Sequence, residues 1–373
     1  MPDTPSRNPQ DRLSMRGGGY YSERTRGAKL VIDRAFPLAA KAVPPRPGAA
    51  GALRLADYGC ADGGTSREMW RRLIEGLRAA GDHREIAMLY TDLASNDFSQ
   101  LFKSMQGLAG DPADAYQALF DGVFVHGCGT GFHRQLAPSY SLDFGFSATA
   151  MHYVSEIPVD LKTHVHMTGA TGAERAAFAT QAAADWERIL LARAAELKPG
   201  GRLVLVNFGI DEDGRWLGNT GGVNMFDQFA ELWGAMRERG EITQREFERA
   251  TFAQHYRTAD EFTAPLVDPA SPVYQAGLRL VSVESRYTRC PYEEAFAGSA
   301  GSMSAAEFAA SLIPTMRSWS ETVFKTALDA RAEAEAQALV DAFYQAYEDR
   351  VAADPAGHAM DYIHILLEIE KVG

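Results

Sequence analysis

Apolar and polar positions follow two different periods along the first 210 residues. Short apolar runs of strand length lie at 53–58, 86–92, 122–126, 142–147 and 202–208. Between them, apolar residues recur every three or four positions, as on one face of a helix, at 27–41, 65–80, 96–105 and 173–197. Strands that alternate with helices predict a parallel sheet covered on both faces.

The pattern changes after about residue 210. Two long stretches, 224–265 and 303–352, are mainly helical in pattern, whereas Leu278–Thr288 and Tyr362–Lys371 have the pattern of strands. In the simplest arrangement these two strands return to the sheet edge as an antiparallel hairpin, and the helices form a cap. The predicted division is a flexible segment 1–14, a core 15–210, cap residues 211–277, a core strand 278–295, cap residues 296–352 and a C-terminal core strand 353–373.

Composition narrows the class of protein. The 373 residues carry 37 Lys and Arg against 49 Asp and Glu, and a net charge of −12 argues against a nucleic-acid backbone as a partner. No apolar run reaches about 18 residues, and the N-terminus lacks the apolar region of a signal peptide. Three cysteines far apart, Cys60, Cys128 and Cys290, suit free thiols. We therefore expect a cytoplasmic protein that binds neither nucleic acid nor membrane.

The most informative segment is Leu55–Ser66, which closes a strand and opens a helix. Its glycines let the backbone approach a ligand, but it matches neither GxGxxG nor a P-loop. Asp92 ends the following strand, where a carboxylate can accept both hydroxyls of a ribose. Adenosine without a pyrophosphate satisfies both features, which indicates S-adenosylmethionine. A plain strand–turn–helix with a solvated acid is the alternative, and Lys198–Leu203 before a later strand favours the methyltransferase.

Five ordered blocks resemble the SABATH family of S-adenosylmethionine-dependent carboxyl methyltransferases, which act on salicylate, benzoate, jasmonate, indole-acetate and xanthines. The blocks are Met15–Ser22, Asp57–Gly63, Thr91–Phe98, Thr130–Pro138 and Ser147–Pro158. The resemblance runs from about Met15 to Lys371. It implies an α/β fold with a methyltransferase-type (Rossmann-like) mixed sheet, helices on both faces and a mainly helical cap. With 30 Arg and 7 Lys, the chain resembles a bacterial member rather than a plant one.

The resemblance also implies roles for individual residues. It assigns Asp92 to the ribose of the cofactor and stacks Phe132 on the adenine. The implied cofactor-binding residues are Tyr21, Thr25, Asp57, Gly59, Cys60, Asp92, Leu93, Gly131, Phe132 and Ser147. The implied acceptor-binding residues are Lys29, Thr149, His152, Tyr153, Met225 and Phe226, of which His152 and Tyr153 are the candidate catalytic pair.

The acceptor site departs from the family pattern. The family holds the acceptor carboxylate with a glutamine and a tryptophan. Here the tryptophan position is Tyr153, and the glutamine position falls near Ala28 and Lys29, so His152 or Lys29 is expected to hold the carboxylate instead. Residues 250–253 lack the Asp and Asn that flank a Phe in some members, so no metal is predicted.

Several of these residues have a simpler explanation. His152 is equally well explained as a hydrogen-bonded histidine of the pocket wall, and Met225 and Phe226 as ordinary core of the cap. His164 and His166 alternate along an extended segment, and we expect them to be exposed.

The chemistry of the reaction needs few protein groups. A carboxylate is already ionised at neutral pH, so its in-line attack on a sulfonium methyl depends on alignment and desolvation. The sequence thus predicts an O-methyltransferase that forms the methyl ester of a small, aromatic or apolar carboxylic acid, working as a homodimer. Methylation of a phenol oxygen or ring nitrogen, with His152 as base, is one alternative. A non-catalytic sensor of cofactor and ligand is the other.

Overall fold

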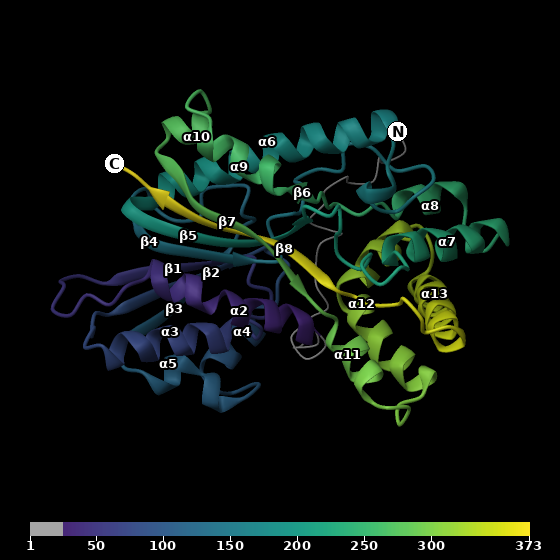
Figure 1. The fold of residues 1–373 in the computed structure, drawn as a ribbon, viewed down its shortest axis with the longest axis horizontal. Helices are drawn as coiled ribbons and strands as arrows, with labels where there is room; N and C mark the ends of the chain where they lie inside the picture. The colour runs from purple at the N-terminus through teal and green to yellow at the C-terminus, as the bar shows by residue number, and fades with distance from the viewer. Residues whose placement is uncertain (1–24) are drawn as a thin grey trace.

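The computed structural model describes residues 25–373, which form one eight-stranded mixed sheet with helices on both faces (Figure 1). The strand order is β3-β2-β1-β4-β5-β8-β7, with β6 paired to β5. The strands are β1 (Leu53–Tyr58), β2 (Ile86–Asp92), β3 (Val123–Gly129), β4 (Leu142–Ala148), β5 (Leu197–Ile210), β6 (Arg257–Thr258), β7 (Leu278–Thr288) and β8 (Tyr362–Lys371). The first five are mutually parallel, and β8 is antiparallel to both β5 and β7. The predicted α/β fold is confirmed.

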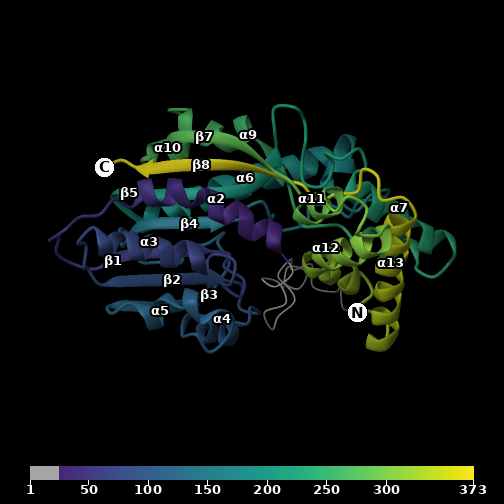
Figure 2. The ribbon, with the colours of Figure 1, turned by 60° about the horizontal axis from the view of Figure 1, so that its bottom comes forward.

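Alternation of side chains along the strands explains the two helical layers. On β5, Val204 and Val206 belong to the core on one face of the sheet, while Leu203 and Leu205 belong to the core on the other. The first face is covered by α2 (Arg26–Ala42), α3 (Arg67–Ala79), α4 (Phe98–Met105) and α5 (Tyr116–Leu119). The second is covered by α6 (Gly172–Glu196), α9 (Ala259–Val267) and α10 (Pro272–Gln275) (Figure 2).

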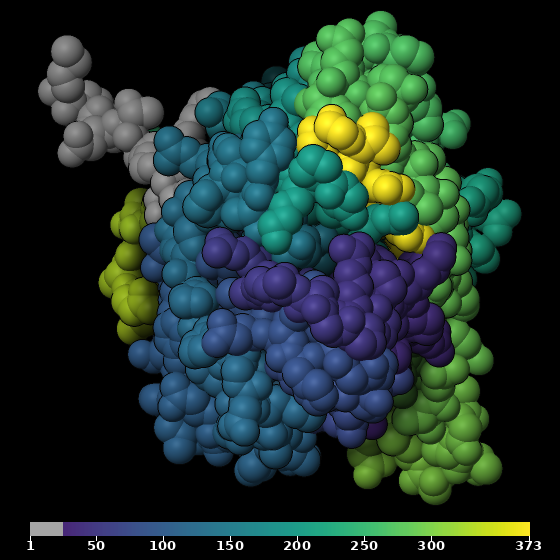
Figure 3. All heavy atoms as spheres, turned by 90° about the vertical axis from the view of Figure 1, so that its left-hand side faces the viewer, coloured from purple at the N-terminus to yellow at the C-terminus, as the bar shows by residue number. Residues whose placement is uncertain are grey.

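The remaining helices form a cap beyond the carboxyl ends of the parallel strands (Figure 1). They are α7 (Met225–Glu238), α8 (Gln244–Arg249), α11 (Pro291–Gly298), α12 (Ala305–Ala327) and α13 (Glu333–Ala353). Aromatic side chains join them; the rings of Phe324 and Phe343, for example, lie 4.3 Å apart between centroids. At the other end of the sheet, residues around α2 lie beside the C-terminal strand at the surface (Figure 3).

The structure differs from the predicted organisation in three places. Strand β8 lies between β5 and β7 rather than at an edge, and α11, α12 and α13 separate β7 from β8, so the pair is no hairpin. Residues 257–277, assigned above to the cap, cover the sheet, because Phe262, Leu266 and Val273 pack into the same core as Trp186. Residues 291–295, assigned to a core strand, begin α11. The predicted flexible segment 1–14 lies outside the described residues.

Several histidines are buried where the sheet meets the cap, among them His152, His166, His255 and His364. The expectation that His164 and His166 are exposed is wrong. Both are buried, and the His166 ring stacks on Phe226 with centroids 3.7 Å apart. Their segment is covered by the cap, since the backbone N–H of Phe252 donates to the Val165 carbonyl.

Burial keeps these histidines neutral. It lowers the pKa of His152 and His166 well below the usual value, and that of His255 and His364 to about 3. Within residues 25–373 no helix is long and apolar enough to cross a membrane.

The buried histidines predict acid sensitivity. In the unfolded chain each titrates near pH 6.5, whereas in the fold each stays neutral, so their contribution to stability is complete above about pH 6.5 and is lost as the pH falls. By pH 5 each fully buried histidine costs about 2 kcal/mol. Urea unfolding of His364→Phe should therefore show a shallower loss of stability between pH 6.5 and 5 than the wild type. His83→Gln, an exposed control, should not change the slope; equal slopes for all three proteins would refute the prediction.

Candidate functional site

A cavity of about 380 Å³ lies at the carboxyl ends of the central strands. Four segments line it: the turn after β1, the loop after β2, the loop after β3 and the turn after β4. The lining residues are Gly59, Cys60, Ala61, Thr65, Asp92, Leu93, Ala94, Gly129, Thr130, Gly131, Phe132, His133, Arg134, Ala148, Thr149, Ala150, Tyr153, Val154 and Ser155. In doubly wound sheets this edge is where ligands bind.

Asp92 fastens the turn after β1 to the loop after β2. Its carboxylate accepts hydrogen bonds from the backbone N–H groups of Ala61 and Leu93, both at 2.7 Å. A carboxylate has about four acceptor positions, so further ones remain for a ligand. Burial raises the pKa of Asp92, and the two backbone hydrogen bonds act in the opposite direction.

Gly59 is required where the turns after β1 and β4 meet. Its φ is +74°, and a Cβ placed on it would lie 2.4 Å from the Cβ of Ala150. A side chain at residue 59 would therefore force these two walls of the cavity apart.

Asp57 and Ser147, predicted to bind the cofactor, lie behind the cavity wall instead. The Asp57 carboxylate accepts from the Ser66 hydroxyl at 2.7 Å and from the Trp70 indole at 2.8 Å. Ser147 donates to the Tyr58 carbonyl at 2.8 Å. Burial raises the pKa of Asp57 to about 6, against the lowering effect of its two hydrogen bonds. Both residues position the turns rather than line the cavity.

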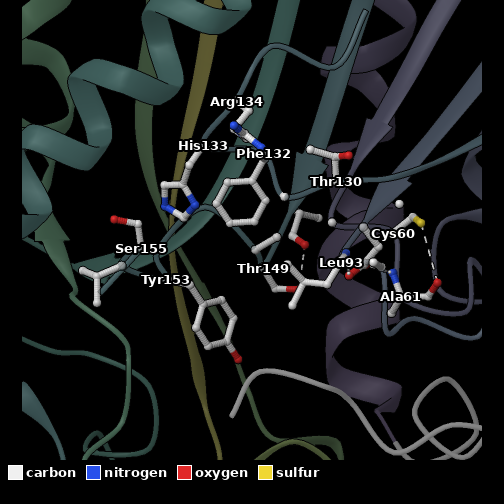
Figure 4. A pocket seen from close by; sticks show the side chains of 18 of the residues that line it. Cys60, Ala61, Leu93, Thr130, Phe132, His133, Arg134, Thr149, Tyr153 and Ser155 are labelled. Atoms are coloured by element: carbon white, nitrogen blue, oxygen red, sulfur yellow. Dashed lines mark hydrogen bonds between the residues drawn. The ribbon is translucent and has the colours of Figure 1, made fainter. Parts of the chain in front are cut away.

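The two long walls of the cavity differ in chemistry (Figure 4). On one wall the rings of Phe132 and His133 lie side by side, with centroids 4.7 Å apart, and burial lowers the pKa of His133 to about 4. Across the cavity lie Cys60 and Ala61. Burial raises the pKa of the Cys60 thiol well above its usual value, so Cys60 is a small wall residue and no nucleophile.

A fully buried ion pair on α6 holds the Phe132 wall. Arg193 and Glu196 are both inaccessible to solvent and bond to each other at 2.7 Å. The Arg193 guanidinium donates to the carbonyls of Phe132 at 2.8 Å and Arg134 at 2.7 Å. Glu196 accepts from the Tyr58 hydroxyl at 2.7 Å, and Tyr58 directly precedes Gly59. We call these two residues the α6 clamp, because they fix two walls of the cavity at once.

A second, apolar cavity of about 30 Å³ lies between the sheet and the cap. Its lining residues are Thr25, Ala28, Thr149, Tyr153, Phe208, Leu217, Gln254, Trp319, Met360 and Tyr362. No lining residue described here is charged at neutral pH. Thr149 and Tyr153 line both cavities, so the two spaces share a wall.

Thr149 forms this shared wall in a strained conformation. Its φ is +54°, which is unusual for a β-branched residue. Its backbone N–H donates to the Val206 carbonyl at 2.7 Å, and its hydroxyl donates to the Ala148 carbonyl at 2.8 Å. Backbone strain of this kind gathers at ligand sites, where the surrounding structure holds it in place.

Two residues predicted to hold the acceptor lie elsewhere. The Lys29 ammonium is bonded to Asp33 of α2 at 2.8 Å and to Glu68 of α3, so it bridges these two helices and lines neither cavity. His152 is 1% exposed and lines neither cavity, because its ring is covered by Tyr153 at 4.5 Å. The structure therefore does not support contact of either residue with the acceptor.

The other predicted residues divide between the cavities and the cap. Gly59, Cys60, Asp92, Leu93, Gly131 and Phe132 line the larger cavity as expected, and Thr149 and Tyr153 line both. Thr25 lines the smaller cavity and not the larger, whereas Met225 and Phe226 are fully buried in the cap core, as in the simpler explanation. Tyr21 lies outside the described residues.

Sequence reasoning missed more than half of the residues that line the smaller cavity, from both the sheet and the cap. The overlooked residues are Phe208, Leu217, Gln254, Trp319, Met360 and Tyr362. A signal existed for Phe208 and Tyr362, which lie at the cap-facing ends of predicted strands. No local pattern marks Gln254 or Trp319. Among residues 25–373 there is no group of three His, Cys, Asp or Glu side chains that could hold a metal ion.

Known proteins resemble this chain over parts of its length. It is 31% identical to indole-3-acetate O-methyltransferase 1 of Arabidopsis thaliana over 170 residues, which are 41% of this chain and 44% of that protein. It is 26% identical to loganic acid O-methyltransferase of Catharanthus roseus over 220 residues, or 51% and 55% of the two chains. It is 27% identical to farnesoic acid carboxyl-O-methyltransferase of Arabidopsis thaliana over 168 residues, or 41% and 45%. The chain thus spans about half the length of these curated relatives.

One solved structure and one family profile each match nearly the whole chain. A solved loganic acid methyltransferase with SAH shares the fold, with a TM-score of 0.70 and 18% identity over 96% of this chain and 99% of that one. The profile of the SAM dependent carboxyl methyltransferases matches residues 21–372. This chain belongs to the SABATH family of S-adenosylmethionine-dependent carboxyl methyltransferases.

Proposed function

We propose that this protein transfers a methyl group from S-adenosylmethionine to the carboxylate of a small, apolar or aromatic acid. The observation that carries the proposal is the wall shared by the two cavities. Because Thr149 and Tyr153 line both, a donor in the larger cavity and an acceptor in the smaller one would meet there. The relatives named above are methyltransferases of indole-3-acetate, loganic acid and farnesoic acid, all carboxylic acids.

The residues of the larger cavity suit an adenosyl group. Asp92 has free acceptor positions for two ribose hydroxyls, and Phe132 offers a flat apolar face to the adenine. Because Gly59 has no side chain, the remainder of S-adenosylmethionine could approach the backbone of this turn closely. When bound, S-adenosylmethionine supplies an electrophilic methyl group on a positively charged sulfur.

The smaller cavity suits a nucleophile that arrives already ionised. Its described lining residues include no histidine, carboxylate or lysine that could remove a proton. His152 lies behind Tyr153 and lines neither cavity, and burial lowers its pKa well below the usual value, so it is a weak base that does not face the acceptor. A phenol or ring nitrogen would more often need a base. A carboxylate needs no base, and the apolar walls of Phe208, Leu217 and Trp319 would strip water from it.

The size of the smaller cavity sets a condition on the acceptor. An apolar cavity that binds benzene has a volume of about 150 Å³, well above the 30 Å³ found here. An aromatic acid therefore requires this cavity to widen. The walls best placed to yield are Trp319, on cap helix α12, and Met360, in the segment that links cap helix α13 to β8.

The cysteines and edge strand β7 bear on the cellular compartment and on the number of subunits. The three cysteines are unpaired, which suits a reducing cytoplasm. Edge strand β7 exposes Val281, Val283 and Tyr287, and an exposed apolar edge favours pairing with a second copy. We therefore propose a cytoplasmic homodimer; sedimentation at micromolar concentration tests the subunit count.

Replacement of Asp92 should weaken cofactor binding selectively. Asp92→Asn keeps the shape but removes the charge that would strengthen hydrogen bonds to the ribose, and each such bond contributes about 1.5–3 kcal/mol. We expect the Kd for S-adenosylhomocysteine, measured by calorimetry, to rise about 10- to 100-fold. Asp114→Asn, at a carboxylate that pairs with Arg71 on the surface, is the control and should bind as the wild type does. An unchanged Kd for Asp92→Asn would contradict the role given to Asp92.

Breaking the α6 clamp should lower both stability and cofactor affinity. Arg193→Met leaves Glu196 buried without its partner, which costs about 3–5 kcal/mol, and releases the Phe132 carbonyl. The Kd for S-adenosylhomocysteine should rise while the KM of the acceptor changes little. Asp82→Asn breaks the buried pair with Arg84 at the far end of the sheet, so it should lower the melting temperature without changing that Kd. If both variants lose affinity equally, general destabilisation explains the effect.

The proposed reaction is tested directly by product analysis. The purified protein is incubated with S-adenosylmethionine that carries a deuterated methyl group and with aryl, indolyl and aliphatic acids, phenols and xanthines. Mass spectrometry should detect a labelled product that mild base hydrolyses, as expected of a methyl ester. A labelled product that resists mild base would indicate phenol or nitrogen methylation. Binding of the cofactor without any product would favour the sensor.

A further inference from the structure

We propose that Gln254 binds the acceptor carboxylate and, together with Tyr153, selects acids over uncharged acceptors. The inference rests on the proposed carboxyl methyltransferase function and deepens it. Ala28, which lines the same cavity, contributes only a methyl group. Within residues 25–373, the donors to the acceptor must therefore come from other lining residues.

The backbone places Gln254 directly opposite Tyr153. The two residues form an isolated antiparallel bridge, and next to it the backbone N–H of His255 donates to the His152 carbonyl at 2.9 Å. Residues that face each other across an antiparallel pair project their side chains to the same side. Both side chains line the smaller cavity, and Tyr153 also lines the larger one. The pair thus lies beside the wall where methyl transfer would occur, and the Tyr153 hydroxyl points away from Phe132 and His133 (Figure 4).

The amide of Gln254 is held in place from behind. Gln254 is 2% exposed, and its side-chain oxygen accepts a hydrogen bond from the Tyr256 hydroxyl at 3.1 Å. Tyr256 is itself buried among aromatic rings, with His152 at 5.7 Å and Phe226 at 6.0 Å between centroids. The Gln254 side chain also hydrogen-bonds to the buried His166 ring. With these two partners behind it, the amide has one N–H donor left to offer to a ligand.

An amide is chemically suited to this task. A carboxylate in an apolar cavity needs hydrogen-bond donors, because leaving it without them costs several kcal/mol. A lysine or arginine would also satisfy it, but would pair with its negative charge and blunt its attack. Gln254 and Tyr153 donate without carrying charge, so they can orient one carboxylate oxygen while the other stays free to attack. An ester, amide or alcohol would gain less from these donors, which gives selectivity for acids.

Two substitutions separate this role from a structural one. Gln254→Leu removes the donors and the bond to Tyr256. Gln254→Glu keeps an acceptor for the Tyr256 hydroxyl but replaces the amide donors with a negative charge facing the substrate. A buried carboxylate is costly in either case, so the readout separates the two roles. A purely structural role predicts a lower melting temperature and a weaker Kd for S-adenosylhomocysteine, whereas binding of a carboxylate predicts a raised KM with that Kd unchanged. Gln337→Leu on α13 serves as the control, since its side chain bonds only to Glu321 and Asp341.

The measurement uses the full chain with indole-3-acetate, benzoate and farnesoate as probes. For the probe that the wild type methylates fastest, we expect Gln254→Leu to raise the KM about 10- to 100-fold, the loss of one hydrogen bond to a charged group. Gln254→Glu should be worse at pH 8 and should recover towards the Leu variant as the pH is lowered and the introduced carboxylate is protonated. The Kd for S-adenosylhomocysteine should stay unchanged in all variants.

Each other outcome has a definite meaning. An unchanged KM in Gln254→Leu, a KM that rises only together with the Kd for S-adenosylhomocysteine, or a Glu variant milder than the Leu variant overturns the role of Gln254 and leaves the proposed function standing. If the wild type methylates none of the three acids but methylates phenols or xanthines in the wider panel, the proposed function and this inference are both overturned.

Discussion

The close approach of two backbone turns is the constraint on which the site depends. The turns after β1 and β4 touch at Gly59 and Ala150, so closely that no side chain fits at residue 59. This contact brings the end of β4 to the edge of the larger cavity. Thr149 then adopts a left-handed conformation, and four residues later Tyr153 can line both cavities. One steric contact thus determines where the two halves of the site meet.

Charged and uncharged polar groups are buried in different parts of the protein. The α6 clamp is charged but saturated with hydrogen bonds, and it holds backbone carbonyls and a tyrosine hydroxyl in fixed positions. The described polar groups that line the smaller cavity are uncharged at neutral pH and include threonine and tyrosine hydroxyls and one amide. Since a nearby cation would stabilise a carboxylate more than the transition state in which its charge is being dispersed, neutral surroundings suit a methyl transfer to an anionic nucleophile.

Local sequence patterns predicted the fold of the core well and the orientation of side chains poorly. Strands β2, β7 and β8 begin and end where hydrophobic pattern placed them, and the glycine turn after β1 needed only its own residues to be recognised. Asp57 and Ser147 sit within the right motif, but only the packed fold shows that they face α3 and β1 rather than the cavity. His152 lies beside Tyr153 in sequence, yet only Tyr153 lines the cavities, because the turn at residues 151–152 leaves the His152 ring behind that of Tyr153. The position of β8 between β5 and β7 depends on pairing across more than 70 residues, which no local period reveals.

The difference between local sequence pattern and the packing of distant segments also explains why the cofactor was easier to infer than the acceptor. The larger cavity is made of turns that directly follow strands, so each wall has a short and regular sequence context. The smaller cavity takes its walls from α2, the β4 turn, β5, the segment at residue 254, α12 and the entry to β8. Side chains from such distant segments meet only after the cap has packed on the sheet. In the proposal made above for Gln254, the donor for the acceptor carboxylate comes from a segment far from Ala28 in the sequence, although both residues line the same cavity. A donor can therefore change its segment without changing the chemistry, and no local pattern would reveal the exchange.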